Sequence, residues 1–410
     1  MAKPLEGIRI LDLTQFLAGS YCTMIFSGLG AEVIKIERPG TGEPGRFMPP
    51  FAGEKGVHLS RQAEDDISLA LLKRCRNKKG VTLNLNSSKG KALLLRLVKK
   101  ADVVIENFRP GTMKKLGLPY SVLAEANPGI VYCSLTGFGP QGAYAHLPAF
   151  DIVIQAIGGL MSVNGDPEGP PTKCGIAIGD LAGGLFCCIG ILAALEHRRK
   201  TGRGQEITVS MLDSILSLMM DEAHDFWQGQ GQPPRSGSRL TRLTPFNAYK
   251  ASDGYYVIAS GSDDHWRTIL NVMQRDDLAD DPRFQNQSGR IERADEVDAL
   301  INAWSREKSV EEVLQGMESQ GIPCAKVRDI PDVLDDRNLL DACSVVPVFH
   351  PVWGKISQVM AAGLPIRFGS SPAHFDQPAP LVGQHNADVY GHWLDLNNEA
   401  LRALRDEGII

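Results

Sequence analysis

The stretch "GIRILDLTQFLAGSYCTMIFSGLGAEVIKIE" at residues 7–37 has the pattern that decides the fold. Residues 7–13 and 31–37 are short runs rich in branched apolar side chains, which is typical of buried strands. Between them, the loop 14–20 and an apolar segment that ends at Gly28 predict one helix. Strand, helix and strand in this order form a βαβ unit, in which the two strands run parallel.

The same alternation continues along the chain. Further strands are predicted at 80–85, 102–108, 130–139 and 206–211, with a candidate strand at 364–369. Helices are predicted after Ser87, near 111–117, and at 212–227 and 397–408. Strands that alternate with helices indicate an α/β fold with a mostly parallel sheet covered on both faces. Such sheets bind ligands beyond the carboxyl ends of their strands.

The chain of 410 residues is long enough for two or three domains. A stretch rich in Gly, Pro and Arg at 228–245 predicts a boundary. After it, two strands around an Asp-Gly turn and several charged helices predict a smaller α+β domain. We therefore expect a large domain at 1–200, a linker helix at 201–229, the small domain at 230–325, and a linker with a return to the large domain at 326–410.

The amino-acid composition indicates which kinds of partner and which cellular compartment to expect. A formal net charge of -5 provides no general attraction to nucleic acid or to an anionic membrane, so neither is expected as a partner. The eight cysteines show no ligand spacing, which predicts free thiols, no metal site and a cytoplasmic protein. The apolar run 181–195 is shorter than the roughly 20 residues that span a bilayer, so it is predicted as a helix buried in protein.

One carboxylate stands out inside the segment "GIAIGDLAGG" at 175–184. Asp180 is the only charged side chain between Lys173 and Glu196. Two interpretations remain open, and both can hold at once. Asp180 is either a helix N-cap that accepts a backbone N–H, or a nucleophile whose solvation is reduced by apolar walls.

Two further stretches follow predicted strands. Arg38 comes directly after the strand at 31–37, and "ENFRPGTMKKLG" offers Asn107, Phe108, Arg109 and Lys115. An aromatic ring near basic groups suits an adenine and its phosphates. The structural alternatives are a solvated surface arginine for Arg38 and an ordinary loop before a helix for the second stretch.

Several motifs in register resemble the family III CoA-transferases, a superfamily that includes formyl-CoA transferase, carnitine CoA-transferase and the α-methylacyl-CoA racemases. They are "GAEVIKIERPG", "ADVVIENFRPGTMKKLG", "LPAFDIVIQAIGGLM", "IGDLAGG" and "IGILAALEHRRKTGRGQEITVSMLD". The resemblance covers essentially the whole chain and is strongest from 4 to about 225. It implies a Rossmann-like large domain, a smaller α+β domain and an interlocked homodimer.

The resemblance also implies a chemistry for Asp180. In the transferases, the matching aspartate attacks an acyl-CoA thioester and forms a mixed anhydride, which CoA thiolate converts to an aspartyl-CoA thioester. An incoming carboxylic acid then takes over the CoA. CoA is a substrate in this scheme, and no tightly bound cofactor is expected. The implied contacts of CoA are Leu17, Ala18, Arg38, Leu83, Asn84, Asn86, Asn107, Phe108, Arg109, Lys115, Phe150 and Asp151.

One departure separates the transferases from the racemases. The racemases have a histidine where this chain has Phe150, and two-base racemisation needs a second group that exchanges protons. Phenylalanine cannot do so, which favours acyl transfer and leaves acyl-CoA racemisation or isomerisation as the alternative. Gln15 and Leu17 also differ from formyl-CoA transferase, and 239–250 lacks its glycine run, so the acid substrate stays open, with a slight preference for small dicarboxylates from family precedent.

Overall fold

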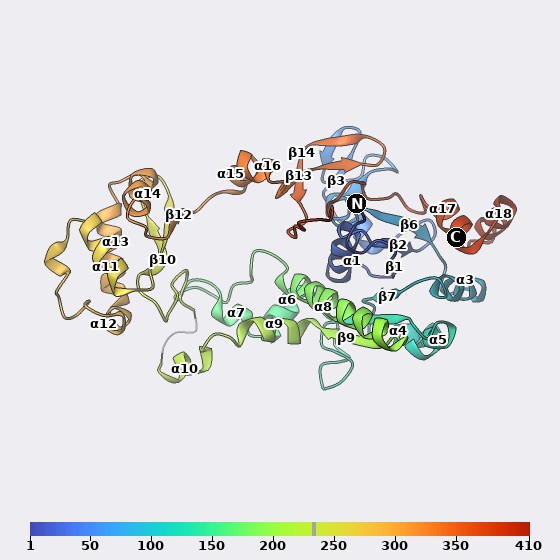
Figure 1. The fold of residues 1–410 in the computed structure, drawn as a ribbon, viewed down its shortest axis with the longest axis horizontal. Coiled ribbons are helices and arrows are strands. Elements are labelled where there is room, and N and C mark those ends of the chain that lie inside the picture. The colour runs from blue at the N-terminus through green and yellow to red at the C-terminus, as the bar shows by residue number, and fades with distance from the viewer. Residues whose placement is uncertain (232–234) are drawn as a thin grey trace. The chain divides into compact units, whose positions relative to one another are not determined.

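The computed structural model describes residues 1–231 and 235–410 (Figure 1). The chain forms two compact units, which are described separately. The first comprises Met1–Leu160, Cys174–Glu222 and Asp336–Ile410, and the second Met161–Lys173 and Ala223–Asp335. The second unit contains the range 230–325 that we predicted for the small domain, extends beyond it on both sides, and also takes in 161–173.

A six-stranded parallel sheet organises the first unit. Its strands are β1 (Arg9–Asp12), β2 (Glu32–Glu37), β6 (Lys78–Thr82), β7 (Val103–Glu106), β8 (Val131–Thr136) and β9 (Glu206–Ser210). They lie in the order β6-β2-β1-β7-β8-β9, and every neighbouring pair is parallel. This is the doubly wound order, in which the connections change direction between β1 and β7. The predicted parallel, Rossmann-like sheet is confirmed.

Helices cover both faces of this sheet. One face packs against α3 (Ser88–Val98), α5 (Tyr120–Ala126), α17 (Asn386–Leu394) and α18 (Asn398–Asp406), in one core with strand residues such as Leu11, Ile34 and Val104. The other face carries α1 (Ala18–Gly28) and α8 (Ile178–Thr201), which pack against each other. The C-terminus returns to the sheet, because the Asn84 N–H donates to the Ile409 carbonyl at 2.8 Å.

The apolar helix α8 differs from our expectation of a buried helix. Gly183, Gly184 and Ile191 are buried, but Leu185, Ile189 and Leu192 are 47%, 61% and 41% exposed. The last three lie one helical turn apart, so they form an apolar stripe on the side away from the sheet. By length and composition alone α8 could cross a membrane, a test that the core helix of a soluble protein also passes.

Two other local predictions were wrong. The helix predicted at 212–227 is two helices, α9 (Met211–Met219) and α10 (His224–Gly229), which belong to different units. The candidate strand at 364–369 does not form; it contains Pro365, which removes a ladder donor. Instead, β13 (Val345–His350) pairs with β14 (Gly354–Ala362), and β3 (Phe51–Gly53), β4 (Gly56–His58) and β5 (Ile67–Ser68) form a small antiparallel sheet.

The second unit has its own core. β10 (Phe246–Lys250) and β11 (Tyr255–Ala259) pair antiparallel across the predicted Asp-Gly turn, and β12 (Cys324–Lys326) extends this sheet. Apolar residues of α11 (Asp263–Val272), α13 (Ala294–Ser305) and α14 (Val310–Glu318) pack on it.

The remaining elements of the two units are short helices. They are η1 (Pro44–Phe47), α2 (Leu69–Arg74), α4 (Thr112–Lys115), α6 (Asp151–Ile157), α7 (Leu160–Val163), η2 (Asp276–Leu278), α12 (Gln287–Glu292), α15 (Ile330–Leu334) and α16 (Arg337–Asp341).

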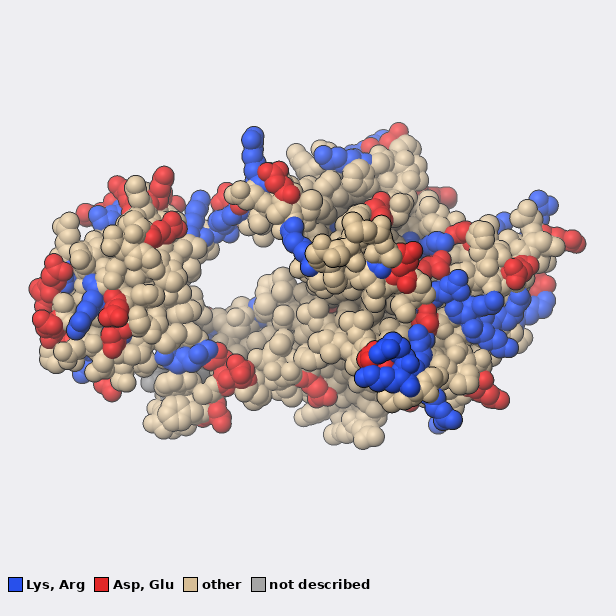
Figure 2. All heavy atoms as spheres, viewed as in Figure 1, with Lys and Arg blue, Asp and Glu red and all other residues tan. Residues whose placement is uncertain are grey.

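Charge is unevenly distributed on the first unit. Figure 2 shows Lys and Arg side chains gathered over the region of α3 to α5. The exposed basic residues of these helices and their flanks are Lys89, Arg96, Lys99, Lys100, Arg109, Lys114 and Lys115. A net charge of -5 therefore coexists with a local basic region at this end of the sheet.

Candidate active site

A cavity of about 750 Å³ lies at the carboxyl ends of the parallel strands. Its wall includes residues 15–18 after β1, 83–86 after β6 and 107–109 after β7, together with Arg38 after β2 and Gly137 after β8. It therefore opens where doubly wound sheets bind their ligands, at the point where the strand order reverses. The C-terminal return also contributes, through Gly408.

Most residues that the sequence singled out come together around this cavity. The predicted residues that line it are Leu17, Ala18, Arg38, Leu83, Asn84, Asn86, Asn107, Phe108, Arg109, Phe150 and Asp180. Two predicted residues, Lys115 and Asp151, are not part of its wall. Lys115 is exposed at the end of α4, although its neighbours Thr112 and Leu116 line the cavity.

Asp180 is not the N-cap of α8, because the helix begins two residues earlier at Ile178 and Ala177 is its N-cap. The Asp151 side chain instead accepts hydrogen bonds from the first turn of α8. Its Oδ1 accepts the N–H of Gly179 at 2.8 Å and that of Asp180 at 3.4 Å. Among the residues that the structure describes, no hydrogen bond or ion pair involves the Asp180 carboxylate oxygens. The capping interpretation was therefore wrong, and the carboxylate stays available to the cavity.

The environment of Asp180 favours its neutral form. Burial raises its pKa to about 7, and the neighbouring Asp151 carboxylate adds to this effect, whereas Arg74 opposes it. Near neutral pH, a substantial fraction of Asp180 is ionised but poorly solvated. A carboxylate in that state is a better nucleophile than one in water, because less solvation must be removed before it reacts.

Close packing places the loop after β1 beside Asp180. Gly184 lies one helical turn after Asp180, and a Cβ there would stand 2.7 Å from the carbonyl oxygen of Ala18. A Cβ at Gly183 would stand 3.1 Å from a methyl group of Leu135. The glycines of "DLAGG" therefore let α8 approach α1 and β8 closely.

The loop itself is held by three polar contacts. The Gln15 N–H donates to Asn107 Oδ1 at 2.7 Å, and Asn107 Nδ2 donates back to the Gln15 carbonyl at 2.8 Å. The Phe16 N–H donates to Glu43 Oε2 at 2.6 Å, and Phe16 has a left-handed backbone with φ of 57°. Its ring meets that of Phe150 edge to face, with centroids 6.0 Å apart. Asn107 thus uses its amide to position the loop.

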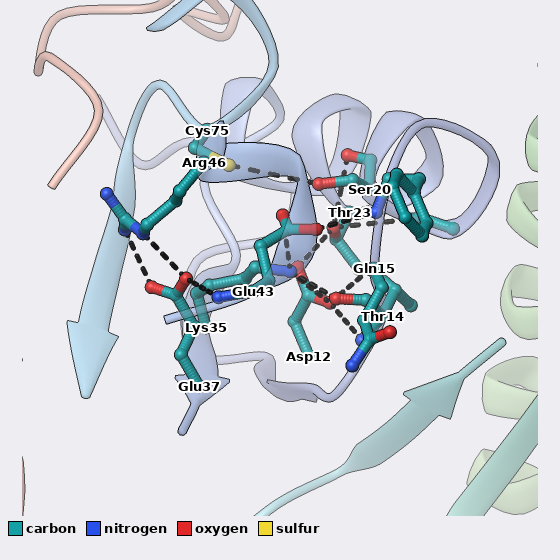
Figure 3. A network of polar contacts seen from close by, with 12 residues as sticks. Asp12, Thr14, Gln15, Ser20, Thr23, Lys35, Glu37, Glu43, Arg46 and Cys75 are labelled. Atoms are coloured by element: carbon teal, nitrogen blue, oxygen red, sulfur yellow. Dashed lines mark hydrogen bonds and ion pairs between the residues drawn. The ribbon is translucent and has the colours of Figure 1, made fainter. Parts of the chain in front are cut away.

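Behind this loop lies a buried ion network that sequence reasoning missed (Figure 3). Asp12, at the end of β1, pairs with Lys78 at 3.0 Å and with Lys35 at 3.9 Å, and Lys35 pairs with Glu43 at 3.3 Å. Lys35 also donates to the carbonyl of Thr14. Burial alone would raise the pKa of Asp12, but Lys35 and Lys78 hold it well below its usual range. In the sequence, nothing distinguishes Asp12, Lys35 and Lys78 from other polar residues of strands.

The fold and the site together define a class: a doubly wound α/β protein with a carboxylate of raised pKa in the cavity at the ends of its strands. The family model of CoA-transferase family III matches residues 5–386, and the chain belongs to this family. The recognition from motifs is confirmed, and the protein is an enzyme of the transferase class.

Relatives of known name agree with this assignment. The chain is 36% identical to the succinyl-CoA:mesaconate CoA-transferase of Haloarcula hispanica, over 94% of this chain and 95% of the relative. It is 34% identical to the formyl-CoA:oxalate CoA-transferase of Streptomyces avermitilis over the full length of both. Among solved structures, a CAIB/BAIF family protein from Brucella suis superposes with a TM-score of 0.82 at 30% identity, covering 96% of this chain and 100% of that protein.

Proposed function

We propose that this enzyme moves CoA from an acyl-CoA donor to a free carboxylic acid, with Asp180 as the nucleophile. The main support is the Asp180 carboxylate, which lines the cavity without a protein partner among the described residues and has a pKa near 7. Residues of suitable chemistry for a nucleotide thioester surround the same cavity.

The proposed reaction exchanges one bond at a time. An Asp180 oxygen attacks the thioester carbonyl, the C–S bond breaks, and an acyl-aspartyl anhydride and CoA thiolate form. The thiolate attacks the aspartyl carbonyl, which releases the donor acid and leaves aspartyl-CoA. The acceptor carboxylate attacks this thioester, and the thiolate freed in that step attacks the acyl carbonyl of the new anhydride. Asp180 is regenerated and water takes no part.

The cavity wall suggests how CoA is held. We propose that Arg38 and Arg109 bind its phosphates, that Phe108 stacks on its adenine, and that Leu17 and Ala18 contact the pantetheine near Asp180. We further propose contacts from Leu83, Asn84, Asn86, Asn107 and Phe150. For Asp151, the proposed role is to fix the start of α8. Lys115 remains a predicted phosphate contact that would act from outside the wall.

Removing one phosphate contact should weaken acyl-CoA binding selectively. We expect Arg38→Ala to raise KM for acyl-CoA by roughly 10-fold or more, since a hydrogen bond to a charged group contributes about 1.5–3 kcal/mol. kcat should change little, because Arg38 lies away from the reacting atoms. Steady-state kinetics of the variant test this, with Arg402→Ala on the exposed side of α18 as a control. An unchanged KM for acyl-CoA contradicts the assignment of Arg38.

The pH dependence should report the ionisation of Asp180. Because the raised pKa keeps Asp180 protonated below about 7, kcat/KM for acyl-CoA should rise about tenfold per pH unit up to that value and then level off. Asp151→Asn keeps an acceptor for the Gly179 N–H but removes a charge, so the rising limb should move to lower pH. Glu196→Gln, at the far end of α8, should leave the profile in place. A profile unmoved by Asp151→Asn contradicts this electrostatic account.

We propose that the acid is a dicarboxylic acid. In the names of the relatives described above, mesaconate, oxalate and the acid of succinyl-CoA each have two carboxylates, whereas the acid of formyl-CoA has one. We also propose that the enzyme acts in the cytoplasm as an interlocked homodimer. The stripe of Leu185, Ile189 and Leu192 on α8 offers apolar surface that a partner subunit can cover.

Racemisation or isomerisation of an acyl-CoA finds less support. Of the described residues that line the cavity, none is a histidine, and Phe150 stands opposite Phe16 where a second base would be needed. His146 is exposed and outside the cavity wall. In deuterated water, a racemase washes deuterium into the α-carbon, whereas the proposed transferase does not.

Covalent trapping tests the proposed function. The enzyme is incubated with an acyl-CoA and quenched with hydroxylamine or borohydride, and its peptides are analysed by mass spectrometry. Hydroxylamine converts an activated Asp180 to a hydroxamate, and borohydride reduces the aspartyl-CoA thioester to an alcohol. A modification confined to the peptide with Asp180 supports the proposal. Exchange activity with no adduct under either quench overturns it.

A further inference from the structure

Arg74 is a buried cation without a partner, at the end of α2. The residue is only 8% exposed, and its Nε and Nη2 atoms are closed off from solvent and make no hydrogen bond. Across residues 1–231 and 235–410, no ion pair within 4 Å involves its guanidinium. Arginines are seldom buried unless they are paired, so an unpaired one indicates that an anion is missing.

The neighbouring buried charges do not fill this role, because they are already matched. Lys78 pairs with Asp12 at 3.0 Å, Lys35 with Glu43 at 3.3 Å, and Arg46 with Glu37 at 2.6 Å. The second oxygen of Glu43, Oε2, accepts the Phe16 N–H. Within the described part of the chain, Arg76, two residues further along, also lacks an ion pair, but its guanidinium donates to the carbonyls of Lys73 and Ala362. Arg74 differs, because among the described residues it has no ion pair, and its Nε and Nη2 make no hydrogen bond.

The guanidinium lies directly behind the cavity wall. The point where a Cβ of Gly45 would stand is 2.7 Å from Arg74 Nη2 and 3.1 Å from Glu43 Oε2, and Glu43 lines the cavity. Arg74 also interacts favourably with the charge of Asp180.

We propose that Arg74 binds the second carboxylate of the acid substrate while the first carboxylate exchanges at Asp180. This inference rests on the proposed function and adds the residue that recognises a dicarboxylate. A guanidinium suits the role, because its planar donors bind a carboxylate with two parallel hydrogen bonds. The acid supplies the anion that the protein itself lacks at this place.

Matched pairs of acceptor acids test the proposal. kcat/KM is measured with one acyl-CoA donor for oxalate against acetate, succinate against butyrate, and glutarate against valerate. Arg74→Met should lower the value for the best dicarboxylate by roughly 10- to 100-fold and leave its monocarboxylate partner within about twofold. For the dicarboxylate, kcat/KM of Arg74→Lys should lie between the values of the wild type and of Arg74→Met. Lys73→Met, which removes an exposed charge one residue earlier, should behave as the wild type.

Stability provides a second readout. Arg74→Met should not lower Tm, because it removes a buried charge that has no partner. The best dicarboxylate should raise the Tm of the wild type and not that of Arg74→Met. This shift tests Arg74 even if no covalent adduct of Asp180 is found.

Three outcomes overturn the proposal. If Arg74→Met lowers kcat/KM equally for both acids of a pair, and its pH profile of kcat/KM moves to higher pH, then Arg74 acts only through Asp180. A lowered Tm with equal losses means a structural role. A dicarboxylate that protects Arg74→Met as well as the wild type means that it binds elsewhere.

Discussion

Asp180→Asn is expected to lower kcat/KM for CoA transfer by roughly 10⁴-fold or more, the scale on which removal of a catalytic nucleophile acts. The amide has nearly the size and shape of the carboxylate but cannot form the acyl anhydride. The helix start should persist, because Asp151 accepts the N–H groups of Gly179 and Asp180. Initial rates of CoA exchange and the trapping of adducts measure the effect.

The same substitution should stabilise the protein at alkaline pH. The folded-state pKa of Asp180 is raised from 3.8 to about 7, so its contribution to stability is present below pH 4 and is lost as the pH rises through 7. Above pH 7, the ionised group is buried at a cost that asparagine does not have. Tm of Asp180→Asn should therefore exceed that of the wild type more at pH 8 than at pH 5. Residual exchange above about 1% of the wild-type rate, or a lower Tm at pH 8, contradicts this account.

The parallel sheet was predictable because its strands alternate with helices at regular spacing. The branched apolar runs 7–13 and 31–37 became β1 and β2, and the residues that follow them line the cavity. Parallel strands expose the residues after their carboxyl ends at one edge, so the positions of Arg38 and 107–109 follow from topology. Asp180 stood out because it is a lone charge in an apolar segment.

Features that depend on pairing across the fold were not predictable. Lys78 reaches Asp12 across 66 positions in sequence, and nothing near either residue indicates the pair. Glu43 lies in a glycine-rich stretch that looks like a surface turn, yet it is buried. Arg74 belongs to a run of basic residues at 73–79, a pattern typical of a solvated face, and its burial appears only when α2 is packed. The apolar stripe of α8 was missed because composition does not reveal which side of a helix is covered.

The buried ion network should make Asp12 essential for stability. Asp12→Asn is expected to lower the free energy of unfolding by about 3–5 kcal/mol, because breaking a buried pair leaves its partner charge uncompensated. The stranded charge is Lys78, which is 3% exposed and 3.0 Å from Asp12. Urea unfolding followed by circular dichroism measures the loss. Glu32→Gln, in the partly exposed pair with Lys79, should cost less than about 1 kcal/mol.

Two further measurements separate this electrostatic effect from lost packing. Lys78→Met in the Asp12→Asn background should recover part of the stability, since the uncompensated charge is then gone. The pKa of Asp12 is depressed in the folded state, so its contribution is present above its unfolded pKa and is lost as the pH falls below it. The variant should therefore lose less stability than the wild type on acidification from pH 5 to pH 3. Equal acid sensitivity of the two proteins, or a double variant no more stable than Asp12→Asn, shows that the charge of Asp12 does not hold this part of the fold.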